Sequence, residues 1–278
     1  KTVSAHARGR FLGIEEDLSM VITSRDNKIF KKAKSLSVRE KRDENKMFLA
    51  EGSRAVRDAA KKNVKLHALL LREGTAPPFT PSCPVYTFSP RLFGEISQTV
   101  TPQGIAAICS MRELSLEDIR VNENSAVIMC EDVQDPGNIG TIIRSAHACF
   151  AGGVVLTKGC CDLYNPKIIR ATMSSVFSVP VIRNVSAQKA VSFFKKKGFK
   201  IIGGALGKDS SVLYETDIKG KTLIIIGNEG NGIKKETLDM CDKRVIIPMK
   251  SDAESLNAAV AASIMLYEHA RQNAKNFG

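Results

Sequence analysis

The chain has 278 residues, enough for two modest domains or one large one. Its hydrophobic content of 43% and charged content of 25% are ordinary for a globular protein. The formal net charge is +12, and residues 20–72 hold 15 Lys or Arg against 6 Asp or Glu, which supplies +9 of it. Such a basic block is typical of a polyanion-binding surface, although a solvated, lysine-rich helix face has the same composition. No apolar run approaches the roughly 18 residues of a membrane span, so no membrane partner is expected.

Cysteine usage and the first residues indicate the compartment. The odd number of cysteines, without a CxxC pair or Cys/His ligand spacing, argues against a disulfide framework or zinc site, and no metal is expected. Cys109 and Cys130 lie in apolar runs, as in a reduced cytoplasmic protein, whereas the adjacent Cys160 and Cys161 leave a redox-sensitive pair as an alternative. Residues 1–19 lack the apolar region of a signal peptide, so we expect a disordered leader or extension there.

Residues 20–110 are predicted to form a small α/β domain. From residue 26 to 37, Ile29, Phe30, Ala33 and Leu36 recur on one face of an amphipathic helix whose other face is lysine-rich. The polar residues 111–122 are interpreted as a linker. Within this domain we expect strands at 46–52, 66–71, 84–88 and 104–110, and helices at 26–37, at 53–62 and from Ser89.

Residues 123–278 are predicted to form a second α/β domain. Near-continuous Val/Ile runs alternate with helical segments, which indicates a parallel sheet covered by helices on both faces. We expect strands at 126–131, 153–157, 179–183, 200–204, 222–226 and 244–247, and helices at 138–149, 166–173, 186–197, 234–241 and 254–273.

Three of these strands run directly into polar loops. The segments are AVIMCEDVQDPGNIGTIIRSA, LIIIGNEGNGI and VIIPMKSDAESLNAAVAA. Loops at the carboxyl edge of an open α/β sheet are where ligands bind, so we expect one site built from all three. The absence of GxGxxG after the first strand argues against a dinucleotide-binding enzyme.

Taken singly, the polar residues of these loops have ordinary structural explanations. Asn138 is explained by helix capping and Arg144 by a solvated surface charge. Glu229 is harder to explain, because a glycine turn needs no carboxylate. Ser255 and Asn257 are placed in the first turn of a last helix that is apolar all round. Such a helix must be buried, and we expect it to pack against a second subunit.

Together, the three segments resemble the motifs of the SpoU/TrmH branch of the SPOUT RNA methyltransferases over roughly residues 123–270. The stretch YNPKIIRATMSSVFSVPV is similar to that family's intervening segment. FLAEGSRAVRDA and TPQGIAAI resemble a small α/β RNA-binding domain related to a ribosomal-protein fold. Ser175 and Ser251 stand where many members have glycine, which puts substrate and loop geometry in doubt more than activity.

The resemblance implies a parallel-sheet SPOUT fold with a deep trefoil knot, S-adenosylmethionine (AdoMet) as cofactor, and a homodimer with the active site near its interface. It implies methylation of a ribose 2′-hydroxyl in structured RNA, with ribosomal RNA favoured and transfer RNA possible. An inactive RNA-binding or ribosome-assembly factor is the alternative. A decayed enzyme, however, would have no physical need to keep the catalytic set Asn138, Arg144, Glu229, Ser255 and Asn257.

The resemblance also implies roles for these residues. Arg144 would act on the hydroxyl, although a guanidine with a pKa of ~12.5–13.8 is an awkward base, and anchoring a phosphate is an equally physical role. Asn138 and Glu229 would fix Arg144 and the ribose, while Ser255 and Asn257 shape the site. The predicted cofactor contacts are Gly227, Asn228, Ile247, Met249 and Leu256.

The basic block supplies the predicted RNA contacts. These residues are Lys28, Lys31, Lys32, Lys34, Arg39, Lys41 and Arg42, with Lys167 and Arg170 nearer the site. Binding through them would be mostly phosphate contact and steeply salt-dependent. Because no predicted cofactor residue precedes Asn138, the catalytic domain is expected to bind cofactor without the first domain.

Overall fold

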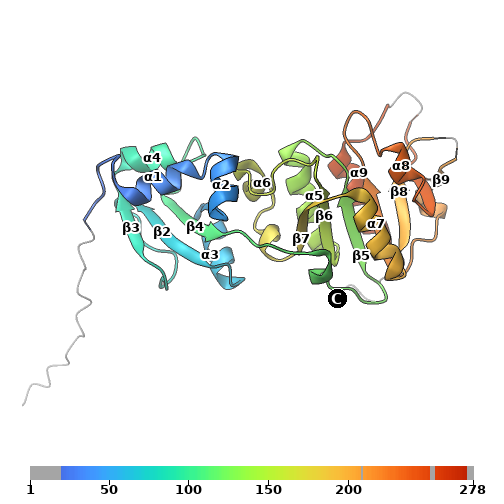
Figure 1. The fold of residues 1–278 in the computed structure, drawn as a ribbon, viewed down its shortest axis with the longest axis horizontal. Helices are drawn as coiled ribbons and strands as arrows, with labels where there is room; N and C mark the ends of the chain where they lie inside the picture. Colours follow the sequence, from blue (N-terminus) through green and yellow to red (C-terminus); the bar gives the residue numbers. More distant parts are fainter. Residues whose placement is uncertain (1–19, 208, 251–253, 274–278) are drawn as a thin grey trace, which may run out of the picture.

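The computed structural model describes residues 20–207, 209–250 and 254–273. A smaller N-terminal and a larger C-terminal α/β domain lie side by side (Figure 1). The expectations for residues 1–19 and for Ser251 lie outside the described residues. Among the helices that the structure describes, none is long and apolar enough to cross a membrane.

The N-terminal domain is a four-stranded sheet with helices on both faces. The strand order is β1-β4-β2-β3, with β4 antiparallel to β1 and β2, and β3 parallel to β2. Helices α1 and α4 pack on one face and α3 on the other. The elements are β1 (Met47–Glu51), β2 (Leu66–Arg72), β3 (Val85–Phe88), β4 (Ile105–Ser110), α1 (Lys28–Ser35), α2 (Arg39–Asn45), α3 (Ser53–Lys61) and α4 (Pro90–Ile96).

The first amphipathic helix forms as predicted. Asn27 caps it by accepting hydrogen bonds from the backbone N–H groups of Ile29 and Phe30. Phe30, Ala33 and Leu36 are fully buried. Helix α2 has no counterpart among the predicted helices, because its sequence, REKRDEN, has no apolar periodicity. Arg42 is the only buried residue of this helix.

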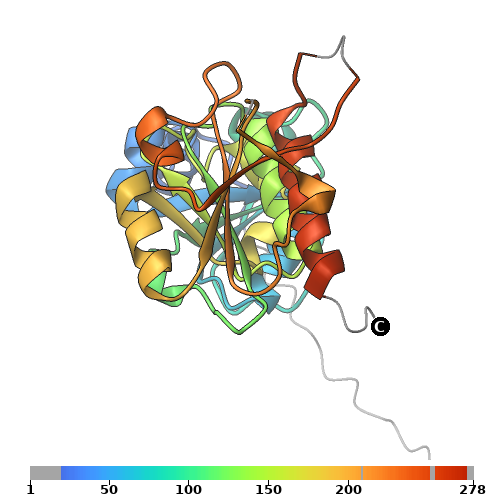
Figure 2. The ribbon, with the colours of Figure 1, turned by 90° about the vertical axis from the view of Figure 1, so that its right-hand side faces the viewer.

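The C-terminal domain contains a seven-stranded sheet in the order β7-β6-β5-β10-β8-β11-β9. Every neighbouring pair is parallel, which confirms the predicted parallel sheet. Helices α5 and α9 cover one face and α7 the other (Figure 2). The strands are β5 (Ala126–Cys130), β6 (Gly153–Thr157), β7 (Val181–Val185), β8 (Lys200–Gly204), β9 (Ser211–Val212), β10 (Thr222–Ile226) and β11 (Lys243–Ile246); the helices are α5 (Pro136–Ala148), α6 (Pro166–Ala171), α7 (Ala187–Lys196), α8 (Lys235–Leu238) and α9 (Ala258–Asn273).

Three local features differ from expectation. Helix α9 begins at Ala258 rather than at residue 254, so Ser255 and Asn257 precede it. Strand β9 is a two-residue edge strand, too short to leave a pattern. Residues 111–122 do not form a free linker, because Leu116 and Ile119 are buried in the core between α7 and the sheet. The predicted deep trefoil knot stays a prediction.

The two domains share one hydrophobic core. Phe48 of β1 packs against Tyr164 and Phe177 of the C-terminal domain, with ring centroids 4.7 Å and 6.3 Å apart. All three side chains are buried within a single apolar cluster that spans both domains. The N-terminal domain is therefore docked on the C-terminal domain by apolar packing.

Candidate active site

Small-ligand sites are clefts or cavities of about 300–1,000 Å³. One of 550 Å³ lies at the carboxyl edge of the sheet, at the ends of β8, β10 and β11. Eight of the predicted site residues line it: Gly227, Asn228, Glu229, Ile247, Met249, Ser255, Leu256 and Asn257.

The sequence reasoning missed the end of a fourth strand. Gly204, the last residue of β8, also lines the cavity together with the following Ala205 and Leu206. The signal was present, since KIIGGALG is another apolar run that breaks into glycines. Strand-end reasoning of the kind used for the other three loops would have included it.

Backbone forms the wall of this cavity at Gly227. A Cβ atom there would lie 2.1 Å from the carbonyl carbon of Gly232, so only glycine fits. The loop is closed by paired backbone hydrogen bonds between Asn228 and Gly232, at 3.0 and 2.9 Å. The Asn228 side chain adds bonds from the N–H groups of Gly230 and Asn231, and it donates to the Asp132 carbonyl. The loop is thus fixed before any ligand binds.

A polar network joins the three predicted segments. Asn138 Nδ2 donates to Glu229 Oε1 at 2.9 Å, and Asn257 Nδ2 donates to Asn138 Oδ1 at 2.8 Å. The backbone N–H groups of Gln134 and Asp135 also donate to the Glu229 carboxylate, at 3.3 and 3.2 Å. Asn138 is 7% exposed, so both of its bonds are largely shielded from water. The strand-end pattern correctly brought these segments together.

Two residues in the network region have capping roles that differ from expectation. Asp135, not Asn138, caps α5 by accepting a bond from the Asn138 N–H at 2.8 Å. Asn257 caps α9 by accepting from the N–H groups of Ala259 and Val260. The Asn138 side chain is thereby released from local capping and faces Glu229.

The environment keeps Glu229 ionised. Partial burial alone would raise its pKa, but the hydrogen bonds from Asn138 and from backbone N–H groups outweigh this and lower the pKa below its ordinary value. Glu229 is therefore a carboxylate at neutral pH and accepts hydrogen bonds without donating any.

Arg144 is not part of this network. It is exposed on α5, and it forms no hydrogen bond or ion pair with any residue that the structure describes. Four residues before it, Gly140 lies so close to α6 that an added Cβ would be 2.3 Å from Ala171 Cβ. One turn beyond Gly140, Arg144 is therefore near the contact between α5 and α6. The buried Ser175 lies on the same side and contacts His147 Nδ1 at 3.2 Å.

The predicted RNA-contacting residues of the N-terminal domain are mostly exposed and paired. Lys31, Lys34 and Lys41 form ion pairs at 2.8, 3.1 and 2.7 Å, and Arg39 lies 3.6 Å from Asp43. Exposed pairs of this kind are worth about 0–1 kcal/mol, so phosphates can replace the carboxylates at little cost. Lys28 is exposed, whereas Lys32 is half-buried and bonded to Asn45. We call Lys28, Lys31 and Lys34 the α1 lysines.

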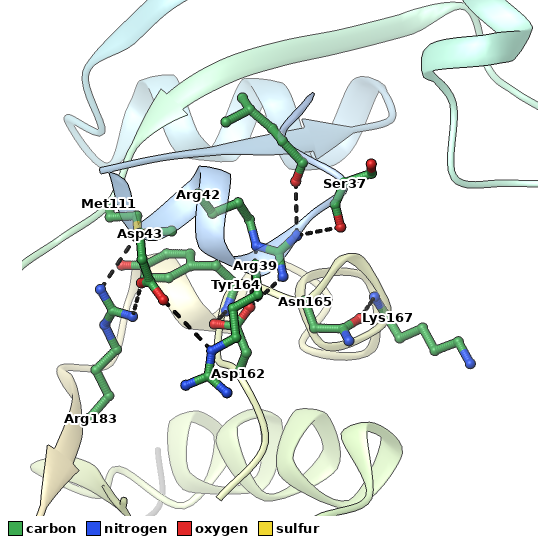
Figure 3. Close-up of polar contacts among 11 residues, drawn as sticks. Ser37, Arg39, Arg42, Asp43, Met111, Asp162, Tyr164, Asn165, Lys167 and Arg183 are labelled. Carbon is green, nitrogen blue, oxygen red and sulfur yellow. Dashed lines mark hydrogen bonds and ion pairs between the residues drawn. The ribbon is translucent and has the colours of Figure 1, made fainter. Parts of the chain in front are cut away.

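The expectation that Arg42 contacts RNA is wrong. Its side chain is 4% exposed and is consumed by protein acceptors. Nη1 donates to the carbonyls of Leu36 and Ser37, both at 2.8 Å, and Nη2 donates to Asp162 Oδ2 at 2.5 Å (Figure 3). The burial of Arg42 could not be predicted from the sequence of α2, because Arg42 stands in a run of charged residues and nothing in that run distinguishes it from the exposed ones.

The two basic residues of α6 differ in their surroundings. Lys167 is exposed, and its N–H is bonded to the capping side chain of Asn165. Arg170 is half-buried, and its Nη1 atom is buried without a hydrogen-bond partner among the described residues. A buried donor in this state is costly, so an acceptor from a ligand would stabilise it.

Neither a metal nor a reactive thiol is indicated by the described residues. Within them, no three His, Cys, Asp or Glu side chains are grouped so as to hold a metal ion. Burial raises the pKa of Cys161 to about 12, with the neighbouring Cys160 adding to it. That thiol is protonated at neutral pH, which argues against the redox-sensitive alternative.

The comparisons with known proteins define the class. Residues 125–267 match the SpoU rRNA Methylase family, and residues 27–107 match the MRM3-like substrate binding domain. The chain belongs to the SpoU rRNA methylase family. Its parallel-sheet domain has the corresponding SPOUT fold, and its smaller domain is the substrate-binding unit.

Individual relatives span almost the whole chain. The chain is 35% identical over 248 residues to the 23S rRNA (guanosine(2553)-2′-O)-methyltransferase RlmP of Bacillus subtilis, covering 88% of this chain and 97% of that protein. The AdoMet complex of the SpoU methyltransferase AviRb from Streptomyces viridochromogenes superposes with a TM-score of 0.82 at 29% identity, covering 88% and 98% of the two chains. The AdoMet-bound rRNA methyltransferase from Sinorhizobium meliloti gives 0.82 at 30% identity, covering 90% and 97%.

Proposed function

We propose that the protein is an RNA 2′-O-ribose methyltransferase that uses AdoMet and acts on ribosomal RNA. The observation that carries this proposal is the convergence of Asn138, Glu229 and Asn257 beside a backbone-walled cavity, in a chain of the SpoU family. The named relative and the named structures support the reaction and the cofactor.

The cavity fits the proposed cofactor. Its volume of about 550 Å³ suits a small ligand, and Gly227 lets the loop close on Gly232 at the cavity wall, where a Cβ atom would clash. Ile247, Met249 and Leu256 offer apolar surface, while Gly227 and Asn228 line the polar side of the cavity. When bound, AdoMet would supply the methyl group. Its sulfonium carries a positive charge, so the sulfur leaves readily as a neutral thioether.

The residues around the cavity would position the acceptor ribose. Displacement requires the 2′-hydroxyl oxygen to be aligned with the methyl carbon and its proton to be removed. The Asn138–Glu229–Asn257 network is rigid and anionic, so it would orient hydroxyl groups by accepting hydrogen bonds. Arg144 would bind the phosphate beside the target ribose as a bidentate donor, which requires no deprotonation. Ser255, exposed at the cavity edge, would complete the acceptor side.

The RNA would also contact α6 and the N-terminal domain. Arg170 would turn its buried, unpartnered Nη1 outward to donate to a phosphate oxygen, with the exposed Lys167 nearby on the same helix. The α1 lysines, with Lys41 and Arg39, would bind more distant phosphates by exchanging their carboxylate partners.

We also propose a homodimer formed through α9. Val260, Ile264 and Tyr267 are exposed on one side of this helix, beside an apolar groove of about 360 Å³ that includes Leu213 and Tyr214. A contiguous apolar surface of this kind is typical of an interface. Ile264→Asp should convert a dimer to a monomer in sedimentation experiments, and a wild-type protein that sediments as a monomer would contradict this assignment.

The substrate class is tested by presenting purified ribosomal RNA and transfer RNA separately, with methyl-labelled AdoMet. We expect label in ribosomal RNA. Label only in transfer RNA would establish the alternative substrate. If AdoMet binds but neither RNA is labelled, the RNA-binding or assembly-factor alternative is favoured instead.

A further inference from the structure

We propose that Arg42 and Asp162 are positioning residues that hold the substrate-binding domain at one fixed place on the catalytic domain and thereby select the ribose that is methylated. This inference rests on the proposed function. It concerns the contact between α2 and the loop that precedes α6, shown in Figure 3.

The Arg42–Asp162 pair is buried and holds the two domains in one relative orientation. The Arg42 and Asp162 side chains are 4% and 7% exposed, and both Nε and Nη2 of the arginine donate to Asp162 Oδ2, at 3.2 and 2.5 Å. The remaining nitrogen, Nη1, is bonded to the carbonyls of Leu36 and Ser37, where α1 ends. A planar guanidinium held by three acceptors in two domains has one orientation. Buried pairs of this kind are weak evidence for stability, and in some proteins they fix one geometry.

A second arginine crosses the interface in the opposite direction. Arg183 of β7 donates to Asp43, the residue that follows Arg42, at 2.9 Å. The guanidinium also lies 5.3 Å from the ring centroid of Tyr164. Because adjacent residues of α2 are anchored to two separate elements of the catalytic domain, rotation about either anchor alone is prevented.

The Arg42–Asp162 pair is connected through α6 to α5, the helix that carries Arg144. Asp162 is three residues before Asn165, the residue that caps α6. Helix α6 carries Lys167 and Arg170, and its Ala171 packs on α5 at Gly140, one turn before Arg144. The basic face of α1 and the site on α5 are therefore joined through rigid contacts. The distance between the α1 face and the α5 site would then be constant. An RNA that contacts both would always present the same nucleotide to the site.

The decisive experiment replaces the pair in the full-length protein. Arg42→Met with Asp162→Leu removes the charges together and keeps apolar volume, which is commonly neutral for folding. We expect the affinity for S-adenosylhomocysteine to stay within about twofold, because the cavity is not touched. We expect kcat/KM on ribosomal RNA to fall on the order of 10²-fold, as misplacement far from the chemistry can cause. Ribose methylation should spread from one nucleotide to its neighbours.

Asp162→Asn provides a second variant that preserves shape and removes one charge, and it should spread methylation in the same way. The matched control is Asp217→Asn, which breaks an exposed ion pair with Lys200 elsewhere in the same domain and should change neither rate nor site. Wild-type rate and a single methylated nucleotide in the folded double variant would overturn the proposal. An equal loss of S-adenosylhomocysteine affinity would also overturn it, since the pair would then be merely structural. If the wild-type protein labels no ribose at all, the proposed function fails instead.

Discussion

Replacing Asn138 by aspartate should place two carboxylates against each other in the proposed active site. In the wild-type protein, Asn138 Nδ2 donates to Glu229 at 2.9 Å, and Asn138 Oδ1 accepts from Asn257 at 2.8 Å. Asn138→Asp keeps the acceptor for Asn257 and exchanges the donor for a second acceptor. Since Glu229 is ionised at neutral pH, the contact becomes repulsive.

The size of the effect follows from these two changes. A hydrogen bond to a charged group contributes about 1.5–3 kcal/mol. Repulsion between unit charges about 4 Å apart adds about 1 kcal/mol in water and about 4 kcal/mol at an effective dielectric constant of 20. The sum of about 2.5–7 kcal/mol corresponds to a loss of roughly 10²–10⁵ in kcat/KM. Asn138→Ala loses the hydrogen bonds without the repulsion, so its loss should be smaller, about 10–10²-fold.

The pH dependence separates the two variants. Two neighbouring carboxylates raise each other's pKa, so one of them takes up a proton at a pH where isolated carboxyl groups are still ionised. That proton restores a hydrogen bond, and Asn138→Asp should recover relative to Asn138→Ala as pH falls from 8 to about 5. The assay is kcat/KM for RNA methylation of the three proteins across this range. If Asn138→Asp matches the wild-type protein at neutral pH, or if both variants show the same pH profile, the deduced network is not the one that operates.

Three further outcomes are expected. Gly227→Ala should weaken S-adenosylhomocysteine binding at least tenfold in calorimetry, because its Cβ would lie 2.1 Å from Gly232; unchanged affinity would remove the loop from the cofactor site. Burial lowers the pKa of His269 below its ordinary 6.5, so the unfolded chain binds the proton more readily and the free energy of unfolding should fall as pH drops below about 6.5. In urea titrations His269→Gln should reduce this pH dependence. If the free energy of unfolding changes equally with pH in the wild-type protein and the variant, His269 is not its cause. Substituting the α1 lysines by alanine should reduce the slope of log K against log salt by about 0.7–0.9 per lost phosphate contact, whereas alanines at the exposed Lys61 and Lys62 should leave it unchanged; equal effects would make the α1 lysines an ordinary solvated face.

The features predicted from sequence are those that repeat along the chain. The apolar face of α1 and the Val/Ile runs of the parallel sheet are periodic, so their elements form close to the expected bounds. The three strand ends could be placed together because carboxyl ends of parallel strands share one edge. Family resemblance then predicts which polar residues in those loops take part in the reaction.

The features missed depend on contacts distant in sequence. Arg42 is buried only because Asp162, 120 residues later, meets it across the domain interface. Helix α2 has no apolar face of its own, and its position is fixed by its polar contacts with the C-terminal domain. The late start of α9 follows from Asn257, which caps the helix and is also held by Asn138. No local pattern encodes such pairings.

The chemical position of the transferred methyl group tests the proposed function most directly. Methyl-labelled AdoMet is incubated with the full-length protein and unmodified ribosomal RNA, and the nucleosides are separated by mass spectrometry after complete digestion. We expect label on the ribose 2′-oxygen of one nucleotide, with loss of that label in Arg144→Ala while S-adenosylhomocysteine still binds. Label confined to the bases, or full ribose labelling by Arg144→Ala, would contradict it.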